Sequence, residues 1–165
     1  MSSERTGYVG LGSNVGDRLE NLRSACRLLE RRGVRISARS GVYETAPQGE
    51  ILDQPDFLNA VVAVETDAAP LELLAICKTV EAESGREMDG PRHGPRVVDL
   101  DVLALGQETW SDERMTLPHP EILSRRFVLE PLLELAPELV LPDRGRAADG
   151  LSAVADQHVS RVTKL

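Results

Sequence analysis

The sequence predicts an α+β fold, and three observations carry that expectation. Apolar and polar residues alternate in four segments, which is typical of strands that bury one face. In two further segments the apolar residues recur at helical spacing. The order of these segments is β-α-β-β-α-β, the ferredoxin-like arrangement of an antiparallel sheet, here expected with helices on one face. A chain of 165 residues is long enough to bury a sizeable core as one domain.

The first half of this pattern begins with a short strand over residues 8–12, which leads into a turn-forming Gly-Ser-Asn-Val-Gly-Asp cluster. A helix is expected over 17–32, with Gly33 as its stop and an apolar stripe of Leu19, Leu22, Cys26 and Leu29. Alternation over 34–42 then predicts a half-buried strand.

The second half of the core repeats this order after a loop over 46–55 that is rich in Pro, Gly, Gln and Asp. Alternation over 58–64 predicts a strand, and a helix is expected over 70–85, between a proline and a glycine. The last core strand is expected over 98–104.

A C-terminal elaboration is expected from Gly106 onward. It should contain a hairpin, a short proline-bounded helix over 121–126 and a tail. Neither an internal repeat nor a linker interrupts the chain. Residues 1–165 are therefore expected to form a single domain.

The pleat of the predicted sheet places a group of polar residues on one face. If the helices cover the apolar face, the alternate positions point away from them, at Tyr43, Thr45, Phe57, Asn59, Asp99 and Asp101. In the first strand the corresponding positions are Gly10 and Gly12, which have no side chains. The sequence therefore predicts a functional site on this face, with a glycine floor, two carboxylates, an amide, a hydroxyl and an aromatic ring.

The charge and composition of the chain exclude several classes of partner. There are 19 basic and 27 acidic residues, a formal net charge of −8, and few aromatic residues. Nucleic acid is not an expected partner, because such binding needs a positive surface and stacking rings. No apolar stretch reaches the roughly 18 residues of a membrane span, and the N-terminus lacks a signal-peptide pattern. We expect a cytoplasmic protein in which Cys26 and Cys77 are reduced core thiols.

Asp99 and Asp101 are expected on the same side of their strand, about 7 Å apart. Mg²⁺ is commonly held by one or two carboxylates together with substrate phosphates. Three arginines, Arg86, Arg92 and Arg96, precede the pair, and guanidinium groups bind phosphate oxygens. The combination indicates a metal–polyphosphate site, although each part taken alone also fits a solvated strand face or a solvated loop.

Other polar motifs are less specific. His119 precedes Arg125 and Phe127 by a few residues, and such a histidine can bond a phosphate or have a structural role. Glu81 taken alone fits a solvated helix face. The glycines of residues 10–16 do not match a dinucleotide-binding loop, since the third comes one position late, and no lysine follows a glycine-rich run as a Walker A loop requires.

Several segments occur in the order of one known family over nearly the whole chain. They are Gly-Ser-Asn-Val-Gly-Asp at 12–17, Tyr43-Glu44-Thr45, residues 54–60, Glu81, Gly85-Arg86, residues 92–103, Leu117-Pro118-His119-Pro120, Arg125, Phe127 and Ala136-Pro137-Glu138. The twelve residues 92–103 are highly specific. On these segments the sequence resembles the 6-hydroxymethyl-7,8-dihydropterin pyrophosphokinase family of folate biosynthesis, whose fold is also ferredoxin-like.

The resemblance implies an enzyme that transfers the terminal pyrophosphoryl unit of ATP to the hydroxymethyl oxygen of 6-hydroxymethyl-7,8-dihydropterin and releases AMP. Asp99 and Asp101 match the ligands of two Mg²⁺ ions. The implied catalytic residues are Asp99, Asp101, Arg86, Arg92 and Arg96. Those implied to bind the pterin are Thr45, Ala46, Gln48, Phe57, Asn59 and Phe127, and those implied to bind ATP are Lys78, Glu81, Arg96, Val102, Arg114, Thr116, His119 and Arg125. A monomer with these two small-molecule substrates is expected.

The sequence departs from the family pattern at Ala46, Lys78, His93 and Pro120, where we expect changed affinities rather than lost chemistry. Two alternatives remain open at this point. One is a Mg²⁺-dependent nucleotidyltransferase that would use Gly12-Ser13 with the aspartates and release pyrophosphate. The other is a non-catalytic ferredoxin-like module that binds a small molecule and needs neither the aspartates nor the arginines.

Overall fold

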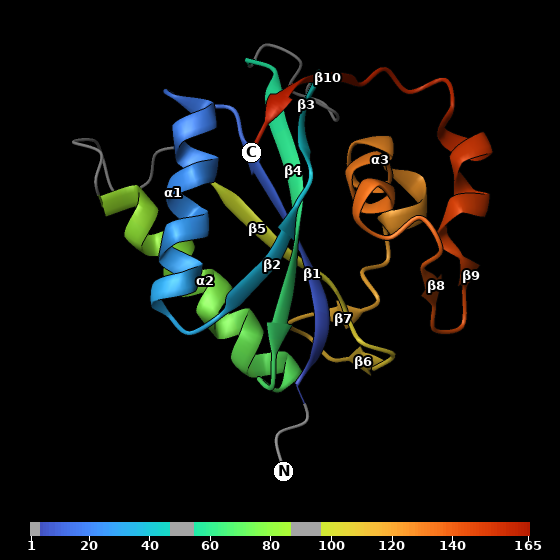
Figure 1. Cartoon of the computed structure of the whole chain (residues 1–165), viewed down its shortest axis with the longest axis horizontal. Coiled ribbons are helices and arrows are strands. Elements are labelled where there is room, and N and C mark those ends of the chain that lie inside the picture. Colours follow the sequence, from blue (N-terminus) through green and yellow to red (C-terminus); the bar gives the residue numbers. More distant parts are fainter. Residues whose placement is uncertain (1–3, 47–54, 87–96) are drawn as a thin grey trace.

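A six-stranded antiparallel sheet forms the centre of the computed structural model (Figure 1), which describes residues 4–46, 55–86 and 97–165, without the side chains of the last two residues of the second range. The strand order is β10-β3-β4-β1-β5, and β2 also pairs with β4. The strands are β1 (Arg5–Ser13), β2 (Arg35–Arg39), β3 (Gly41–Thr45), β4 (Phe57–Thr66), β5 (Asp99–Leu105) and β10 (Ser160–Lys164). The predicted α+β fold is confirmed.

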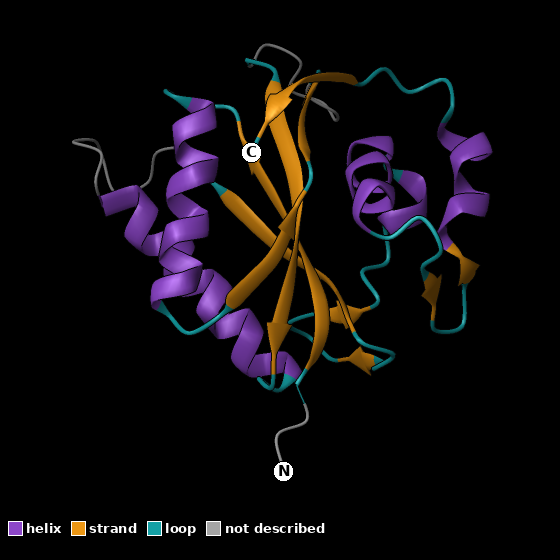
Figure 2. Ribbon diagram, viewed as in Figure 1, coloured by secondary structure: helices purple, strands orange, loops and turns teal. Residues whose placement is uncertain are grey.

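Two helices, α1 (Arg18–Arg31) and α2 (Pro70–Arg86), cover one face of this sheet (Figure 2). They share a core with apolar residues of β1, β4 and β5. Cys26 and Cys77 are free and lie within this core, as predicted, and burial raises the pKa of their thiols to about 11 and about 12. Both core helices thus lie on the side of the sheet opposite the predicted polar face.

The ends of α1 follow from local sequence. Asp17 caps the helix, since its Oδ1 accepts a hydrogen bond from Glu20 N at 3.1 Å. Gly33 follows the helix with a φ of 86°, a left-handed conformation that favours glycine. The predicted boundaries of this helix are correct to within one residue.

The predicted single strand over 34–42 is two strands, β2 and β3, separated by Ser40. The hydroxyl of Ser40 accepts a hydrogen bond from Val61 N at 2.8 Å, and Ser40 N donates to Val61 O at 2.9 Å. The Ser40 hydroxyl therefore accepts the hydrogen bond that a backbone carbonyl would otherwise accept from Val61. Both strands still pair with β4 in antiparallel orientation, so the interruption removes neither of them from the sheet.

The C-terminal elaboration contains more structure than the sequence predicted. The predicted hairpin is present as β6 and β7, but the helix expected over 121–126 is a short 3-10 helix followed by the longer α3. The tail expected after it forms a second hairpin, another 3-10 helix and the edge strand β10. These elements are β6 (Trp110–Ser111), β7 (Thr116–Leu117), η1 (Ile122–Ser124), α3 (Arg126–Leu135), β8 (Val140–Leu141), β9 (Gly145–Arg146) and η2 (Ala147–Val154).

Helix α3 packs on the second face of the sheet, opposite α1 and α2 (Figures 1 and 2). Leu129 and Leu132 form a second core with Val61 of β4 and Leu103 of β5. The predicted placement of helices on one face therefore holds for α1 and α2, and α3 is an additional layer on the other face. This layer turns the polar face of the sheet into the floor of a cleft.

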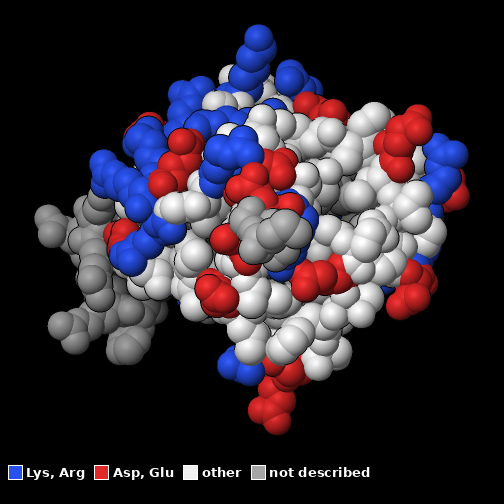
Figure 3. All heavy atoms as spheres, turned by 60° about the horizontal axis from the view of Figure 1, so that its bottom comes forward, with Lys and Arg blue, Asp and Glu red and all other residues white. Residues whose placement is uncertain are grey.

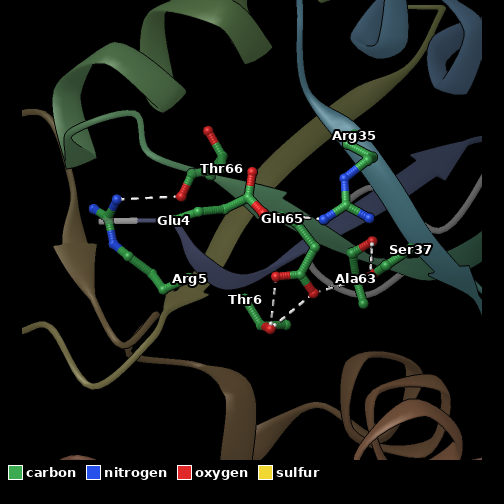
Figure 4. A network of polar contacts seen from close by, with 8 residues as sticks. All are labelled: Glu4, Arg5, Thr6, Arg35, Ser37, Ala63, Glu65 and Thr66. Carbon is green, nitrogen blue, oxygen red and sulfur yellow. Dashed lines mark hydrogen bonds and ion pairs between the residues drawn. The ribbon is translucent and has the colours of Figure 1, made fainter. Parts of the chain in front are cut away.

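A polar network links β1, β4 and β2 near the first residues of β1 (Figure 4). Glu65 of β4 accepts hydrogen bonds from Thr6 of β1, at 2.9 Å and 3.0 Å, and from Ser37 of β2, at 3.2 Å. Arg5 donates to Thr66 O at 3.3 Å. These contacts lie at the opposite end of β1 from its glycines at positions 10 and 12, so they stabilise the strand order without contributing to the site.

Charged side chains on the surface are largely interspersed. On the face seen in Figure 3, basic groups gather towards one side, and acidic groups lie among and beyond them. Several are paired, including Arg39 with Glu30 at 3.2 Å and Arg35 with Glu4 at 3.0 Å. Exposed pairs of this kind contribute at most about 1 kcal/mol each. Among the described residues, no helix is both long enough and apolar enough to cross a membrane.

A leucine in the second core provides a test of how α3 contributes to stability. Leu129 is fully buried, and Leu129→Ala leaves a cavity, so we expect the free energy of unfolding to fall by about 2–5 kcal/mol. Val162→Ala, at an exposed position on β10, should change it by less than about 0.5 kcal/mol. Urea denaturation followed by circular dichroism measures both. One transition is expected if residues 1–165 form a single domain, and two would contradict that prediction.

Candidate active site

The glycines of β1 form part of the floor of a cavity of about 230 Å³ on the α3 side of the sheet. In the strand register, Gly12 lies between Asn59 of β4 and Asp99 of β5, and Gly10 lies beside Asp101. All five residues line the cavity. The sheet register therefore brings together the amide, the carboxylates and the side-chain-free floor at the place where the alternation of the sequence put them.

Two aromatic rings contribute to the walls of this first cavity. Phe57 begins β4 and Phe127 lies in the first turn of α3, and both rings are half-buried. Thr45 and Ala46 at the end of β3 complete the lining near Phe57. Aromatic faces combined with a few polar groups suit a flat ligand with a hydrogen-bonding edge.

Asn59 is the clearest sign that the first cavity suits a polar ligand. Its side chain is buried, and its Nδ2 has no hydrogen-bond partner among the residues that the structure describes. A Cβ at position 12 would lie 3.0 Å from Asn59 Oδ1, so glycine at this position leaves the amide undisturbed. A buried unpaired donor costs about 1–3 kcal/mol, which a ligand acceptor would recover.

Arg125 lies at the entrance to α3 and lines the same first cavity. Its guanidinium lies 5.7 Å from the centre of the Phe127 ring and forms an ion pair with Glu121. A cation over a ring contributes about 0.5–1 kcal/mol at exposed sites. This contact couples the position of the guanidinium to that of the ring.

A second cavity, of about 320 Å³, is lined by residues of α2, β5 and the β6–β7 hairpin. Five positions that the resemblance assigned to ATP lie on its lining: Lys78, Val102, Arg114, Thr116 and His119. Leu74 and Met115 add apolar surface that the sequence analysis did not identify, because an apolar residue on a helix stripe or hairpin is more often part of a core. The second cavity thus combines an apolar surface with basic groups, and three acidic residues, Asp101, Asp112 and Glu113, also line it.

The two cavities share one lining residue, a member of the carboxylate pair. Asp101 is exposed and lines both cavities, whereas Asp99 is half-buried and lines the first. The peptide nitrogen of Leu100, between them, donates to Glu81 Oε2 at 2.8 Å, which ties this part of β5 to α2. Glu81 also lies 3.2 Å from Lys78 Nζ and is nearly buried, so it supports the strand rather than lining either cavity.

His119 has a defined tautomer. Its Nδ1 accepts a hydrogen bond from Glu121 N at 3.1 Å, which leaves the proton on Nε2. Burial lowers the pKa of the imidazole, and the positive charges of Arg125 and Arg144 lower it further, although Asp101 and Glu121 oppose the shift. Near pH 7 the ring is therefore a neutral hydrogen-bond donor on the lining of the second cavity.

Arg144, in the β8–β9 turn, holds the segment that carries His119. Its guanidinium donates to His119 O at 2.6 Å and to Pro118 O at 2.8 Å. On the other side of the second cavity, Asp112 Oδ1 accepts from Arg114 N at 2.8 Å, and this bond lowers the pKa of the Asp112 carboxyl. No sequence signal identified these supports, because each bonds to backbone groups and belongs to no motif.

Some predicted residues lie outside the described part of the chain. These are Gln48, Arg92, Arg96 and His93, together with the side chain of Arg86. Tyr43 points to the polar face, as predicted, but its hydroxyl bonds to Glu134 of α3 and the residue does not line the first cavity. Ser13 is also buried away from both cavities, and its hydroxyl donates to Val97 O at 2.7 Å.

Comparison with known families identifies the chain. Residues 8–137 match the model of the 7,8-dihydro-6-hydroxymethylpterin-pyrophosphokinase (HPPK) family. The chain belongs to this family. The predicted family and the predicted enzyme class, a pyrophosphokinase, are thereby confirmed. The HPPK match includes both aspartates and both cavities.

Named relatives extend this HPPK match. The chain is 48% identical to the 2-amino-4-hydroxy-6-hydroxymethyldihydropteridine pyrophosphokinase of Methylorubrum extorquens, covering 81% of this chain and 84% of the relative. It is 40% identical to the Pseudomonas aeruginosa protein of the same name, covering 94% and 95%. It is also 45% identical to a mitochondrial folate synthesis bifunctional protein of Arabidopsis thaliana, covering 82% of this chain but about a quarter of that protein's length (24%).

A solved structure agrees with the fold. The HPPK-DHPS protein of Plasmodium falciparum superposes with a TM-score of 0.73 over 94% of this chain and 47% of that one, at 14% sequence identity. At this identity the similarity concerns the fold alone. The fold described above is therefore shared, over nearly the whole chain, with this HPPK-DHPS protein.

The depressed pKa of His119 leads to a test by titration. Between the folded pKa and the usual value of about 6.5, the unfolded chain binds more protons than the folded one, so stability is lost as the pH falls through this window. We expect His119→Asn to show a smaller loss of unfolding free energy than the wild type between pH 7.5 and 5. NMR titration of the imidazole gives the pKa directly, and a midpoint at or above 6.5 would contradict the prediction.

Proposed function

We propose that this protein transfers the pyrophosphoryl group of ATP to the hydroxymethyl oxygen of 6-hydroxymethyl-7,8-dihydropterin, with release of AMP, in folate biosynthesis. The observation that carries the proposal is the position of Asp101 on the lining of both cavities. A ligand in each cavity would meet its neighbour at the carboxylate pair. Transfer between two bound substrates requires such a meeting point, and family membership supports their identities.

The first cavity is the proposed pterin site. Phe57 and Phe127 offer ring faces to a flat bicyclic ligand, and Asn59 Nδ2 offers a buried donor to its hydrogen-bonding edge. Thr45 and Ala46 line the same part of the cavity near Phe57. The proposal places Gln48 here on the resemblance alone, since it lies outside the described residues.

The second cavity is the proposed ATP site. Val102 and its apolar neighbours suit a base, and Thr116 adds a hydroxyl. Lys78, Arg114 and the neutral Nε2–H of His119 supply a positive charge or a donor to phosphate oxygens. Arg125 lines the first cavity, so its proposed contact with ATP would be with the phosphates at the boundary rather than with the base. Glu81 acts behind this surface through Leu100.

The donor set at the meeting point fits Mg²⁺. Two carboxylates from one strand supply hard oxygen ligands, and among the described residues no group of three or more metal-ligating side chains occurs. Magnesium sites of nucleotide enzymes commonly combine one or two carboxylates with substrate phosphates and water. Asp99 and Asp101 would hold two ions with ATP, and bound Mg²⁺ would neutralise phosphate charge and lower the pKa of the attacking hydroxyl.

The residues of the chain contribute mainly by positioning and charge. A loose phosphoryl-transfer transition state needs alignment of the attacking and leaving oxygens more than a strong protein base. The stacked pterin would present its hydroxymethyl group towards Asp99 and Asp101, and basic side chains would balance the phosphates. We include Arg86, Arg92 and Arg96 among these groups on the resemblance. A single domain and a monomer remain predictions. A cytoplasmic location also remains a prediction, since the relatives include a protein named as mitochondrial.

The alternatives receive less support. A nucleotidyltransferase that uses Ser13 would need its hydroxyl in a cavity, but this group is buried and bonded to Val97 O. A non-catalytic module would not need a carboxylate at the junction of two cavities. Reaction products distinguish all three hypotheses.

The decisive measurement is a product assay with ATP, Mg²⁺ and 6-hydroxymethyl-7,8-dihydropterin. We expect AMP to form only when the pterin is present, and Asp99→Ala to lower the rate by about 10²–10⁴-fold because the metal site loses a ligand. Asp67→Ala, at an exposed aspartate beyond the far end of β4, is the matched control and should keep full activity. Pyrophosphate as the product would favour the nucleotidyltransferase, and no turnover would favour the non-catalytic module.

Gly12 provides a separate test of the pterin site. In Gly12→Ala the new Cβ would press on Asn59 Oδ1 and displace the buried amide. We expect the KM for the pterin to rise about 5- to 150-fold, the effect of about 1–3 kcal/mol for a misplaced hydrogen-bonding group, while the KM for ATP changes less than about twofold. Steady-state kinetics with each substrate varied in turn measures both constants. Equal changes in the two would argue against a pterin in the first cavity.

A further inference from the structure

Gln157 bonds to the backbone on both sides of Arg125. Its Oε1 accepts from Arg126 N at 2.9 Å, and its Nε2 donates to Ser124 O at 2.9 Å. Arg125 itself has an extended backbone, with φ −125° and ψ 110°. The side-chain amide therefore pairs with this backbone as a neighbouring strand would, and it satisfies the first nitrogen of α3, which has no partner within the helix.

The residue held in this way carries part of the first cavity. Arg125 and Phe127 both line it, and the guanidinium lies 5.7 Å from the ring centre. Residue 126 lies between them, so the bonds of Gln157 determine where the backbone enters α3 and how both side chains are presented. Within the part of the chain that the structure describes, no residue of the sheet hydrogen-bonds to these two backbone groups.

The same C-terminal segment contacts this region a second time and also reaches the other wall of the cavity. The guanidinium of Arg126 donates to Ala155 O at 3.1 Å and to Gln157 O at 2.8 Å. The next residue, His158, accepts a bond from Thr45 Oγ1 at 3.4 Å, and β10 then pairs with β3. The segment thus connects the α3 wall to the wall formed by the end of β3. It lies beyond residues 8–137, which match the family model.

We propose that Gln157 is a positioning residue for the pterin site, which sets the backbone of Arg125 and the ring of Phe127 through its two hydrogen bonds. This role rests on the proposed function of the first cavity. Gln157 lines neither cavity, so it would act through these two residues. Its loss is expected to weaken pterin binding while leaving the carboxylate pair and the second cavity intact.

The test compares Gln157→Ala with Gln107→Ala. Gln107 is a matched control, because its Nε2 also donates to a backbone oxygen, Val140 O at 3.0 Å, but neither of these residues lines the first cavity. For Gln157→Ala we expect the KM for the pterin to rise about five- to thirtyfold, as the loss of two hydrogen bonds implies. The KM for ATP, whose phosphates Arg125 is proposed to contact, should rise less than the KM for the pterin, and kcat should change less than about threefold. Hydrogen exchange at the Arg126 amide should become faster in Gln157→Ala alone.

The outcomes separate this role from a purely structural one. Equal kinetics of the two variants, or a common fall in kcat and in both substrates' kcat/KM that follows a lower Tm, would overturn the positioning role of Gln157. So would an unchanged exchange rate at the Arg126 amide. A wild-type protein that makes no AMP would instead overturn the proposed function of the cavity, and with it the role of Gln157. The assay of the wild-type protein comes first, so this outcome is known before any variant is compared.

Discussion

The register of β1 between β4 and β5 is the constraint on which the rest of the site depends. It sets Gly12 between Asn59 and Asp99, and Gly10 beside Asp101. Since side chains alternate across a strand, the same register buries the intervening apolar residues under α1 and α2. A shift of β1 by one residue would turn its buried Val9 and Leu11 towards the cleft and its glycines towards α1 and α2, so the stability of the core and the placement of the site are one requirement.

The second face is completed by parts of the chain that follow the ferredoxin-like core. Helix α3 brings Phe127 and Arg125 over the glycine floor, and the β6–β7 hairpin forms part of a second cavity beyond β5. Each is braced from further along the chain: Arg144 bonds to the carbonyls around His119, and Gln157 bonds to the backbone around Arg125. The core therefore supplies the acids, and the elaboration supplies the walls that orient ligands against them.

The predictions from sequence that the structure corrects concern this elaboration and one side of the sheet. The helix expected over 121–126 ends where α3 begins, and α3 contains Pro131, a residue that normally argues against a helix interior. Strand β10 has mostly exposed polar residues and no strong alternation, so only its pairing with β3 identifies it. The break at Ser40 depends on a hydroxyl that replaces a backbone acceptor, which a two-residue period does not reveal.

The sequence by itself determined the order of the core elements, the face that carries the site, and the residues of its floor, because alternation and helical spacing report directly on which side of an element is buried. Only the tertiary structure decided that Asp101 lines two cavities, that Asn59 is buried with a donor left unpaired by the described residues, and that Arg144 and Gln157 hydrogen-bond to the backbone of the walls. Those features depend on contacts between residues distant in sequence, many of them with backbone groups, and such contacts leave no periodic pattern in a single sequence.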